Sequence, residues 1–211
     1  MSPGSENMQD IDKAAQAVLK GKVLIYPTET FYALGCSALD SRACGLVFQH
    51  KFRAQAKPLP VLIGGLEQLQ LLSSCSSQVE LQQLADSFWP GPLSVLLPAK
   101  PGLPSQIQNE QGYVSLRWTP HPIAQRLCLE AGRPLVATSA NISLQPPAAR
   151  PKDLDPDLLQ KVDFFLDGRP LPAGGLPSTV VQIAGQNRLW VLRLGAVGEQ
   201  DLLQAGYELV L

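Results

Sequence analysis

Small polar side chains follow several apolar segments of the sequence, at the points where buried strands are expected to end. The run from Pro134 leads into Thr138-Ser139-Ala140-Asn141, and Val23–Tyr26 leads into Pro27-Thr28-Glu29-Thr30. Ligands of open α/β sheets usually bind at the carboxyl ends of strands. Similar groups occur elsewhere in the chain, at Arg117, Pro177-Ser178-Thr179 and Arg193.

Each of these residues, taken singly, is more often structural, because a hydroxyl in a turn commonly bonds to the nearby backbone. Together they supply hydroxyls, one amide and several guanidiniums, with no nucleophile–base pair among them. Such a set indicates a site that binds a phosphorylated or carboxylated ligand and acts on it by positioning and electrostatics.

A local excess of positive charge points in the same direction. The whole chain has 17 Lys and Arg against 18 Asp and Glu, for a net charge of −1. A basic segment on a near-neutral protein suggests a local anion site, such as a phosphate site, rather than a surface for long nucleic acid. A solvated loop without function is the alternative. The segment lies between Asp40 and Glu67, contains no carboxylate, and carries Arg42, Lys51, Arg53 and Lys57.

The common catalytic motifs are absent from the sequence. It has no phosphate-binding P-loop, no dinucleotide fingerprint and no nucleophile elbow. Its Cys and His residues are not clustered as a zinc site requires. His50 continues the apolar stripe of an expected helix, and His121 is expected to cap a helix that begins at Pro122. Asp153, Asp155 and Asp157 lack the Gly and Glu of a calcium loop, so we interpret them as acidic residues at a helix start.

The elements that must position these residues follow from the apolar periodicity. Helices are expected over about 8–20, from 41, after 77–80 and from 122, and strands over 23–26, 59–63, 93–97, 113–117 and 134–141. In the strand over 113–117, the side chains of Tyr113, Ser115 and Arg117 face one side. The segments 179–183 and 189–194, joined by Gly185-Gln186-Asn187, predict a hairpin. The pattern predicts an α/β domain with a mixed sheet.

Length and composition favour one reduced, cytoplasmic domain. The 211 residues are enough to bury a core without disulfides or a metal, and no linker-like stretch divides them. We expect the four cysteines to be free structural thiols. No apolar run approaches the roughly 18 residues of a membrane span, and the N-terminus lacks the apolar core of a signal peptide.

Six segments, in order along the chain, resemble the signature motifs of the YrdC family, the threonylcarbamoyl-AMP synthases. The first, Pro27–Cys36, resembles P-T-[DE]-T-x-Y-G-L-G. The second, Lys51–Leu59, resembles K-x-R followed by [KN]-P-L. The others are Ser115–Pro122, Thr138–Ser143, which resembles T-S-A-N-x-S, Pro177–Val181, which resembles P-S-T-[VI]-[VI], and Arg193–Gly195, which resembles R-x-G.

The resemblance implies a fold and an activity. The expected fold is α/β, with a twisted mixed parallel and antiparallel sheet flanked by helices around a basic cavity. It forms a single domain over residues 1–211, with its core at about 8–206 and without the C-terminal extension of the longer synthases. The expected activity is a nucleotidyltransferase that forms threonylcarbamoyl-AMP and pyrophosphate from L-threonine, bicarbonate and ATP with Mg²⁺. Its product serves the threonylcarbamoyl modification of an adenosine in tRNA, through separate transfer proteins.

Residue roles follow from the matched positions. The resemblance implies that Thr30, Arg117 and Ser178 contact threonine or its carboxylated form, and that Tyr32 forms a wall of that pocket. It implies no covalent nucleophile and leaves the Mg²⁺ ligands open. The implied nucleotide-binding residues are Lys51, Arg53, Lys57, Ser139, Asn141 and Arg193.

Three positions depart from the family pattern, and they bear on ligand fit more than on fold. Ala33 and Leu144 replace glycines, and Ala54 replaces the proline that follows K-x-R. Two other functions stay open. One is an RNA-binding YrdC-like module without catalysis, which the shortage of stacking aromatics near the basic segment disfavours. The other is a paralogous YrdC-family enzyme that uses another acceptor.

Overall fold

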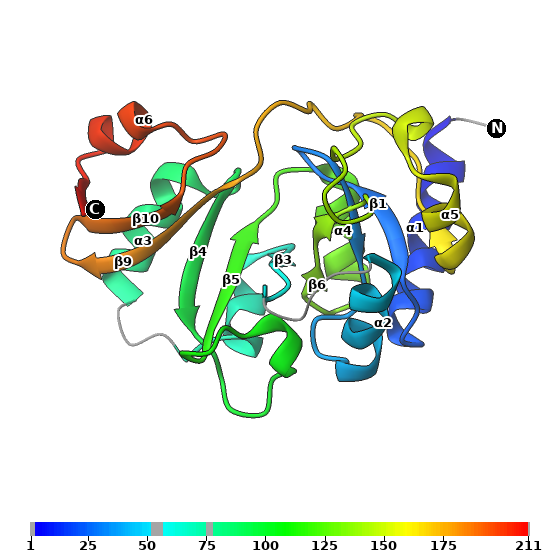
Figure 1. Ribbon diagram of the computed structural model, residues 1–211, viewed down its shortest axis with the longest axis horizontal. Helices are drawn as coiled ribbons and strands as arrows, with labels where there is room; N and C mark the ends of the chain where they lie inside the picture. The colour runs from blue at the N-terminus through cyan, green and yellow to red at the C-terminus, as the bar shows by residue number, and fades with distance from the viewer. Residues whose placement is uncertain (1–2, 52–56, 75–77, 211) are drawn as a thin grey trace.

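The computed structural model describes residues 3–51, 57–74 and 78–210. Two β-sheets lie next to each other with helices packed around them (Figure 1). The half of the molecule that holds β1, α1, α4 and α5 lies on the right in this view, and the half that holds β9, β10 and α6 lies on the left. The chain passes from the right half to the left half in the segment between β8 and β9. The α/β class predicted from the sequence is confirmed, with two sheets rather than one.

The smaller sheet has four strands in the order β7-β2-β1-β8. Strand β1 is antiparallel to β2 and parallel to β8, and β2 is antiparallel to β7. The loop that joins β1 to β2 carries the Thr28-Glu29-Thr30 sequence. The bounds are β1 Leu24–Pro27, β2 Tyr32–Gly35, β7 Thr138–Ser139 and β8 Phe164–Phe165.

The larger sheet has seven strands in the order β11-β10-β9-β4-β5-β3-β6. Parallel pairs (β3–β5, β4–β9 and β10–β11) alternate with antiparallel pairs, so the sheet is mixed throughout. The predicted hairpin is confirmed as β9–β10. The bounds are β3 Val61–Ile63, β4 Leu93–Pro98, β5 Tyr113–Trp118, β6 Leu135–Val136, β9 Thr179–Gly185, β10 Arg188–Arg193 and β11 Glu208–Val210.

The helices begin and end mostly where the periodicity predicts, although the first begins at Pro3 rather than at about Met8. Asp155 accepts hydrogen bonds from the backbone N–H groups of Asp157 and Leu158, at 2.8 and 3.1 Å, which confirms an acidic helix start there. The α-helices are α1 Pro3–Leu19, α2 Ser41–Lys51, α3 Gln78–Phe88, α4 Pro122–Glu130, α5 Pro156–Lys161 and α6 Glu199–Gln204. Short 3₁₀ turns are η1 Leu66–Leu71, η2 Ser105–Ile107 and η3 Pro151–Asp153.

Strand β1 is buried on both faces, which explains its uninterrupted apolar sequence. Leu24 belongs to a core cluster that includes Val18 of α1 and Leu127 of α4, whereas Ile25 belongs to a second cluster that includes Val47 of α2. Burying one such side chain contributes about 1.5–3 kcal/mol. Packing on both faces therefore fixes the end of β1, and with it the loop over residues 28–31.

The strand expected over residues 134–141 is divided between the two sheets. Strand β6 pairs with β3 of the larger sheet, and β7 pairs with β2 of the smaller one. Between them, the backbone N–H of Ala137 donates to the carbonyl of Pro60 at 2.9 Å. The segment therefore joins the two sheets, and it does so beside the cavity described below.

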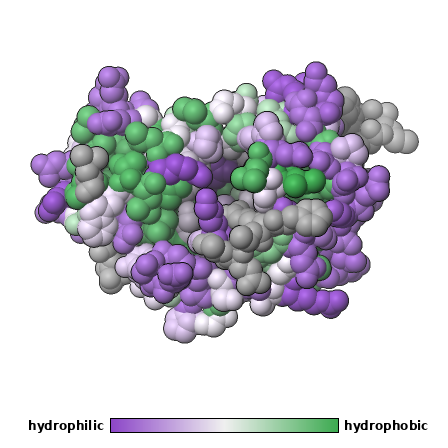
Figure 2. All heavy atoms as spheres, viewed as in Figure 1, coloured by the Kyte–Doolittle hydropathy of each residue, from purple (hydrophilic) through white to green (hydrophobic). Residues whose placement is uncertain are grey.

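The outer surface of the β9–β10 hairpin is apolar. Trp190, Leu192 and Leu194 are exposed, and Figure 2 shows hydrophobic side chains gathered on the side of the molecule where β9 and β10 lie. Val181 and Leu189 of the same hairpin are buried in the core. The hairpin is thus apolar on both faces, although only one of them packs against the rest of the described chain.

Candidate active site

A cavity of about 360 Å³ lies between the two sheets. Its walls come from the loop over residues 28–33, the segment over 58–62, the segment over 137–139, and strands β4, β5, β9 and β10. The polar segments that the sequence singled out therefore meet in one place, although they are up to 165 residues apart between Thr28 and Arg193.

The floor of the cavity is a single row of side chains across the larger sheet. Leu62 pairs with Arg117, and Ser94 pairs with Val180, which pairs with Arg193. Because Val95 pairs with Leu116 in antiparallel register, Ser94 lies opposite Arg117 and completes the row. All five residues line the cavity. The row places two guanidiniums near its ends with a hydroxyl between them, an arrangement suited to an anionic ligand.

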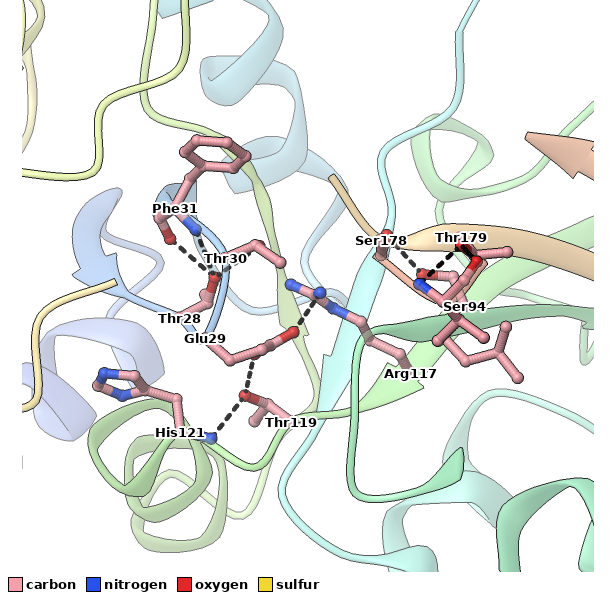
Figure 3. Close-up of polar contacts among 12 residues, drawn as sticks. Thr28, Glu29, Thr30, Phe31, Ser94, Arg117, Thr119, His121, Ser178 and Thr179 are labelled. Carbon is pink, nitrogen blue, oxygen red and sulfur yellow. Dashed lines mark hydrogen bonds and ion pairs between the residues drawn. The ribbon is translucent and has the colours of Figure 1, made fainter. Parts of the chain in front are cut away.

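Arg117 is the more buried of the two arginines, with its side chain only 9% exposed. It forms an ion pair with Glu29 through Nη1 and Oε1 (Figure 3). Among the described residues, Glu29 is the one partner with which the Arg117 side chain forms an ion pair or hydrogen bond. A guanidinium carries five N–H donors, so most of those of Arg117 remain for a ligand.

Arg193 is linked through Ser178 to Ser94, the residue that lies opposite Arg117 in the floor of the cavity. Its guanidinium donates to the carbonyl of Ser178 at 2.6 Å and to Ser178 Oγ at 3.1 Å. Ser94 Oγ also donates to Ser178 Oγ at 3.1 Å. Because Ser178 Oγ accepts from both neighbours, its own hydrogen is left to donate to a ligand. Burial, and then the positive charge of Arg117, lower the pKa of Arg193 from its usual value.

Two motif glycines are explained by close backbone contacts. A Cβ at Gly195 would lie 2.1 Å from the carbonyl oxygen of Pro177, and one at Gly35 would lie 1.8 Å from the carbonyl oxygen of Val136. Neither position has room for a side chain. Gly195 thereby holds the end of β10 against the Ser178 segment, which keeps Arg193 and Ser178 together.

The loop over residues 28–31 forms the opposite wall of the cavity. Thr28 Oγ1 donates to the carbonyl of Phe31 at 2.7 Å and lies 3.3 Å from Thr30 Oγ1 (Figure 3). Tyr32 is fully buried and donates from its hydroxyl to Asp167 at 2.7 Å. Burial and this hydrogen bond raise the pKa of Tyr32 well above its usual value, so Tyr32 is a neutral wall residue.

The segment after β8 closes over that loop. The backbone N–H groups of Ala173 and Gly174 donate to the carbonyls of Glu29 and Thr30, at 3.1 and 2.7 Å. His121 Nε2 lies 2.9 Å from the carbonyl of Pro170 in the same segment. The expectation that the His121 side chain caps α4 is wrong, because the ring is turned toward Pro170 and makes no capping hydrogen bond. Burial lowers the pKa of His121.

Lys51 lies behind the cavity wall rather than in it. Its ammonium donates to the carbonyl of Ser139, to the carbonyl of Asn141 at 2.8 Å and to Asn141 Oδ1 at 2.9 Å. Ser139 Oγ donates to the same Asn141 Oδ1 at 2.5 Å. Lys51 therefore fixes the shape of the Ser139–Asn141 segment, of which Ser139 lines the cavity.

The structure brings most of the residues predicted from the sequence to this cavity. Lys51 and Asn141 stand directly behind it, Lys57 is exposed outside its lining, and Arg53 lies outside the described residues. The basic segment is thus not a continuous exposed surface, because Lys51 is buried. The predicted residues that line the cavity are Thr30, Tyr32, Arg117, Ser139, Ser178 and Arg193.

Two of the departures from the family pattern have a structural explanation. Ala33 lies in β2 with ordinary extended backbone and lines the cavity, so this position does not require glycine for its conformation. Leu144 has a φ of 75°, which favours glycine, and its side chain is fully exposed. Ala54 lies outside the described residues.

Two residues of the site were not identified from the sequence. Ser94 is the polar residue on the cavity face of β4, and the alternation of that strand was the signal that could have revealed it. Glu29 is part of a recognised motif, but nothing in the sequence indicated that its partner is Arg117. Among the described residues, there is no cluster of three His, Cys, Asp or Glu side chains that could hold a metal ion. No helix in the described ranges is long and apolar enough to cross a membrane.

Comparison with known proteins gives consistent results. The Sua5/YciO/YrdC family model, described as "Telomere recombination", matches residues 16–195. A threonylcarbamoyl-AMP synthase of Pyrococcus abyssi is 36% identical over 170 residues, covering 81% of this chain and 49% of the relative. A threonylcarbamoyl-AMP synthase of Stenotrophomonas maltophilia is 35% identical over 173 residues, covering 79% of this chain and 88% of the relative.

Solved structures show the same fold. P. abyssi Sua5 complexed with L-threonine superposes with a TM-score of 0.86 at 32% identity, covering 95% of this chain and 58% of that protein. E. coli YciO superposes with a TM-score of 0.73 at 24% identity, covering 88% and 89% of the two chains, and this likeness bears on the fold alone. The chain thus spans about half the length of the P. abyssi synthase and most of the S. maltophilia one. By the family match and by these identities, the chain belongs to the Sua5/YciO/YrdC family.

Proposed function

We propose that this protein is a threonylcarbamoyl-AMP synthase, which forms threonylcarbamoyl-AMP and pyrophosphate from L-threonine, bicarbonate and ATP. The observation that carries the proposal is the floor of the cavity, where Arg117, Ser94 and Arg193 stand in one row and no carboxylate is among the described residues of the lining. Relatives with that name, and a relative solved with L-threonine, support the same activity for this chain.

The reaction needs no covalent enzyme intermediate. The neutral amine of threonine attacks carbon dioxide, which bicarbonate supplies with loss of water, and forms a carbamate. A carbamate oxygen then attacks the α-phosphorus of ATP, the bond to the β-phosphate oxygen breaks, and pyrophosphate leaves. Both reacting partners are anions, so their repulsion is part of the barrier, and nearby guanidiniums offset it. This agrees with a cavity whose described lining holds the guanidiniums of Arg117 and Arg193 and several hydroxyls, but no nucleophile–base pair.

The cavity divides into two regions in this proposal. Arg117, Thr30 and the hydroxyl of Ser178 bind the carboxylate and hydroxyl of threonine, with Tyr32 as a neutral wall. Ser139 and Arg193 face the nucleotide, with Asn141 and Lys51 supporting Ser139 from behind. Roles for Arg53 and Lys57 in binding the phosphates stay predictions from the family motif.

Magnesium is part of the substrate in this proposal. The described residues that line the cavity supply hydroxyls and guanidiniums but no carboxylate, and Mg²⁺ is commonly held by phosphate oxygens with few protein ligands. We therefore expect MgATP to bring its own ion. The product would pass to separate transfer proteins in the cytoplasm for the modification of tRNA.

Pyrophosphate release tests the proposal directly. We expect release to require ATP, L-threonine and bicarbonate together, in buffer freed of carbon dioxide before bicarbonate is added. Release that is independent of bicarbonate would contradict the carbamate mechanism. Release that requires bicarbonate but proceeds with a different acceptor would identify a paralogous family activity, and salt-dependent RNA binding without any release would favour the RNA-binding alternative.

A further inference from the structure

We propose that Glu29 is a positioning residue, which orients the guanidinium of Arg117 for the carboxylate of the amino acid; this rests on the proposed function. Glu29 does not line the cavity, whereas Arg117 does. Figure 3 shows Glu29 beside Arg117, on the side where the loop over residues 28–31 approaches Thr119. In the wild-type protein, the side chain of Glu29 therefore reaches the ligand site through its contact with Arg117 rather than by lining the cavity.

Glu29 is held from several directions, which makes it a fixed anchor. Its Oε2 accepts a hydrogen bond from Thr119 Oγ1 at 2.9 Å, and its Oε1 contacts Arg117 Nη1. Thr119 Oγ1 in turn accepts from the backbone N–H of His121 at 3.2 Å, which leaves its own hydrogen for Glu29. The backbone carbonyl of Glu29 accepts from the N–H of Ala173 at 3.1 Å. Both the side chain and the backbone of Glu29 are therefore tied in place.

The charge of Glu29 is what permits Arg117 to be buried. An isolated buried guanidinium is costly, and a carboxylate partner offsets that cost. Arg193 faces the same cavity, and no Asp or Glu is among the described residues that line it, so loss of Glu29 would leave two guanidiniums there without the carboxylate that pairs with Arg117. Their repulsion would drive the Arg117 side chain to other rotamers.

A fixed guanidinium binds a carboxylate more tightly than a mobile one. The ion pair with Glu29 is made through Nη1, and Arg117 lines the cavity with the rest of its guanidinium unpaired among the described residues. The ligand therefore meets donors that are already oriented, and less conformational entropy is lost on binding. Glu29 thus sets the affinity for threonine without touching it.

The test is a double-mutant cycle of Glu29→Ala and Arg117→Ala, read in the KM for threonine and in the Kd for ATP. We expect Glu29→Ala to raise the KM for threonine about tenfold to 100-fold, with a nearly unchanged Kd for ATP. Glu29→Gln should fall between wild type and Glu29→Ala, because its amide oxygen keeps a polar partner for Arg117 but lacks the negative charge. Glu130→Ala is the matched control, since Glu130 forms an exposed pair with Arg126 at 3.3 Å.

The sign of the coupling decides between positioning and general destabilisation. In Arg117→Ala, Glu29 stays behind as a carboxylate without its partner and repels the carboxylate of threonine. Adding Glu29→Ala to Arg117→Ala should therefore leave the KM for threonine unchanged or lower it. If the increases in the KM for threonine of the two single variants multiply in the double variant, the proposal is overturned. A normal KM in Glu29→Ala would also overturn it. Thermal unfolding of each variant identifies any that fails to fold, in which case the Glu29→Gln comparison decides.

The same assay separates this proposal from the proposed function. A wild-type protein that shows no dependence on threonine would overturn the function, and this result is obtained before any variant is made. If pyrophosphate release by the wild-type protein depends on threonine, but the effects of the two single variants on KM multiply in the double variant, only the role of Glu29 is overturned.

Discussion

Arg117 and Lys51 are both buried cations beside one cavity, but the protein uses them differently. The ammonium of Lys51 donates to neutral oxygens of Ser139 and Asn141. Arg117 pairs with a single carboxylate and keeps most of its donors toward the cavity. An ammonium has three donors, so those three contacts use its capacity, whereas a guanidinium has five.

The difference teaches which buried cation shapes a site and which one binds its ligand. A cation whose donors all bond to the protein fixes the backbone around it, and its removal should lower the free energy of unfolding. A cation with unpaired donors can bind an anion, and its removal should weaken the affinity for the ligand. Arg193, which is exposed and bonds to neutral groups of Ser178, belongs with the second kind but is less strongly held.

The largest expected effect is that of Arg117→Ala on threonine. Loss of a charge-assisted hydrogen bond costs about 1.5–3 kcal/mol, so the KM for threonine should rise roughly tenfold to 150-fold. Equilibrium binding of ATP should stay nearly unchanged, as measured by titration calorimetry. Arg117→Lys should rescue in part, since an ammonium cannot reproduce the planar fork. An equal loss of ATP binding would mean that the cavity is not divided as proposed.

Lys51→Met should act mainly on stability. The substitution keeps an apolar stem of similar length but removes the donor for three buried oxygens, so we expect the unfolding free energy to fall by about 2 kcal/mol in urea denaturation. ATP should bind more weakly as a consequence, because the Ser139–Asn141 segment loses its support. Lys13→Met is the control, since Lys13 forms an exposed pair with Asp10. Unchanged stability with lost ATP binding would make Lys51 a direct ligand of the nucleotide.

Arg193→Ala should have a smaller effect, confined to the nucleotide side. Its guanidinium is partly exposed and, among the described residues, bonds to Ser178 alone, so we expect the Kd for ATP to rise about tenfold or less. Arg188→Ala is a matched control on the same strand, because Arg188 forms an exposed pair with Glu208 outside the cavity lining. If Arg193→Ala raises the KM for threonine more than the Kd for ATP, Arg193 belongs to the threonine region of the cavity rather than to the nucleotide region.

Much of the fold could be predicted because local signals agreed with the final packing. The apolar runs of β1, β3 and β4 end at proline or glycine, and α2 and α4 begin where the apolar period begins. The division into two sheets could not be predicted. It depends on β6 and β7, which are separated by Ala137 alone and pair with strands far away in the sequence.

The site was predictable where a motif or an alternating strand marked its residues. Arg117 stands on the polar side of β5, and Ser178 lies in the Pro177–Val181 motif, so both were found. The pairing of Glu29 with Arg117 was not, because it joins a loop and a strand that are 88 residues apart, and composition does not tell which carboxylate meets which cation. The supporting role of Lys51 was also hidden, since a basic motif predicts contact with an anion rather than with carbonyl oxygens.

The smallest expected effect concerns the turn that follows the Ser139–Asn141 segment. The backbone N–H of Gln145 donates to the carbonyl of Ile142 at 3.1 Å, and Leu144 has a φ of 75° at the third position of this turn. A left-handed conformation costs a residue with a Cβ about 1–2 kcal/mol, and glycine avoids this cost. Part of the resulting gain in stability is lost, because glycine also raises the entropy of the unfolded chain. Since the Leu144 side chain is fully exposed, no buried contact would be lost.

We therefore expect Leu144→Gly to raise the unfolding free energy by about 0.5–1 kcal/mol and to preserve the affinity for ATP. Leu144→Ala is the control, because alanine shortens the side chain but keeps the Cβ that makes this conformation costly. Its stability should stay close to that of wild type. If both variants lose stability, the side chain of Leu144 packs against the protein in solution. If alanine stabilises as much as glycine, the gain comes from removing an exposed apolar side chain rather than from the backbone. Urea denaturation of the three proteins side by side separates these cases.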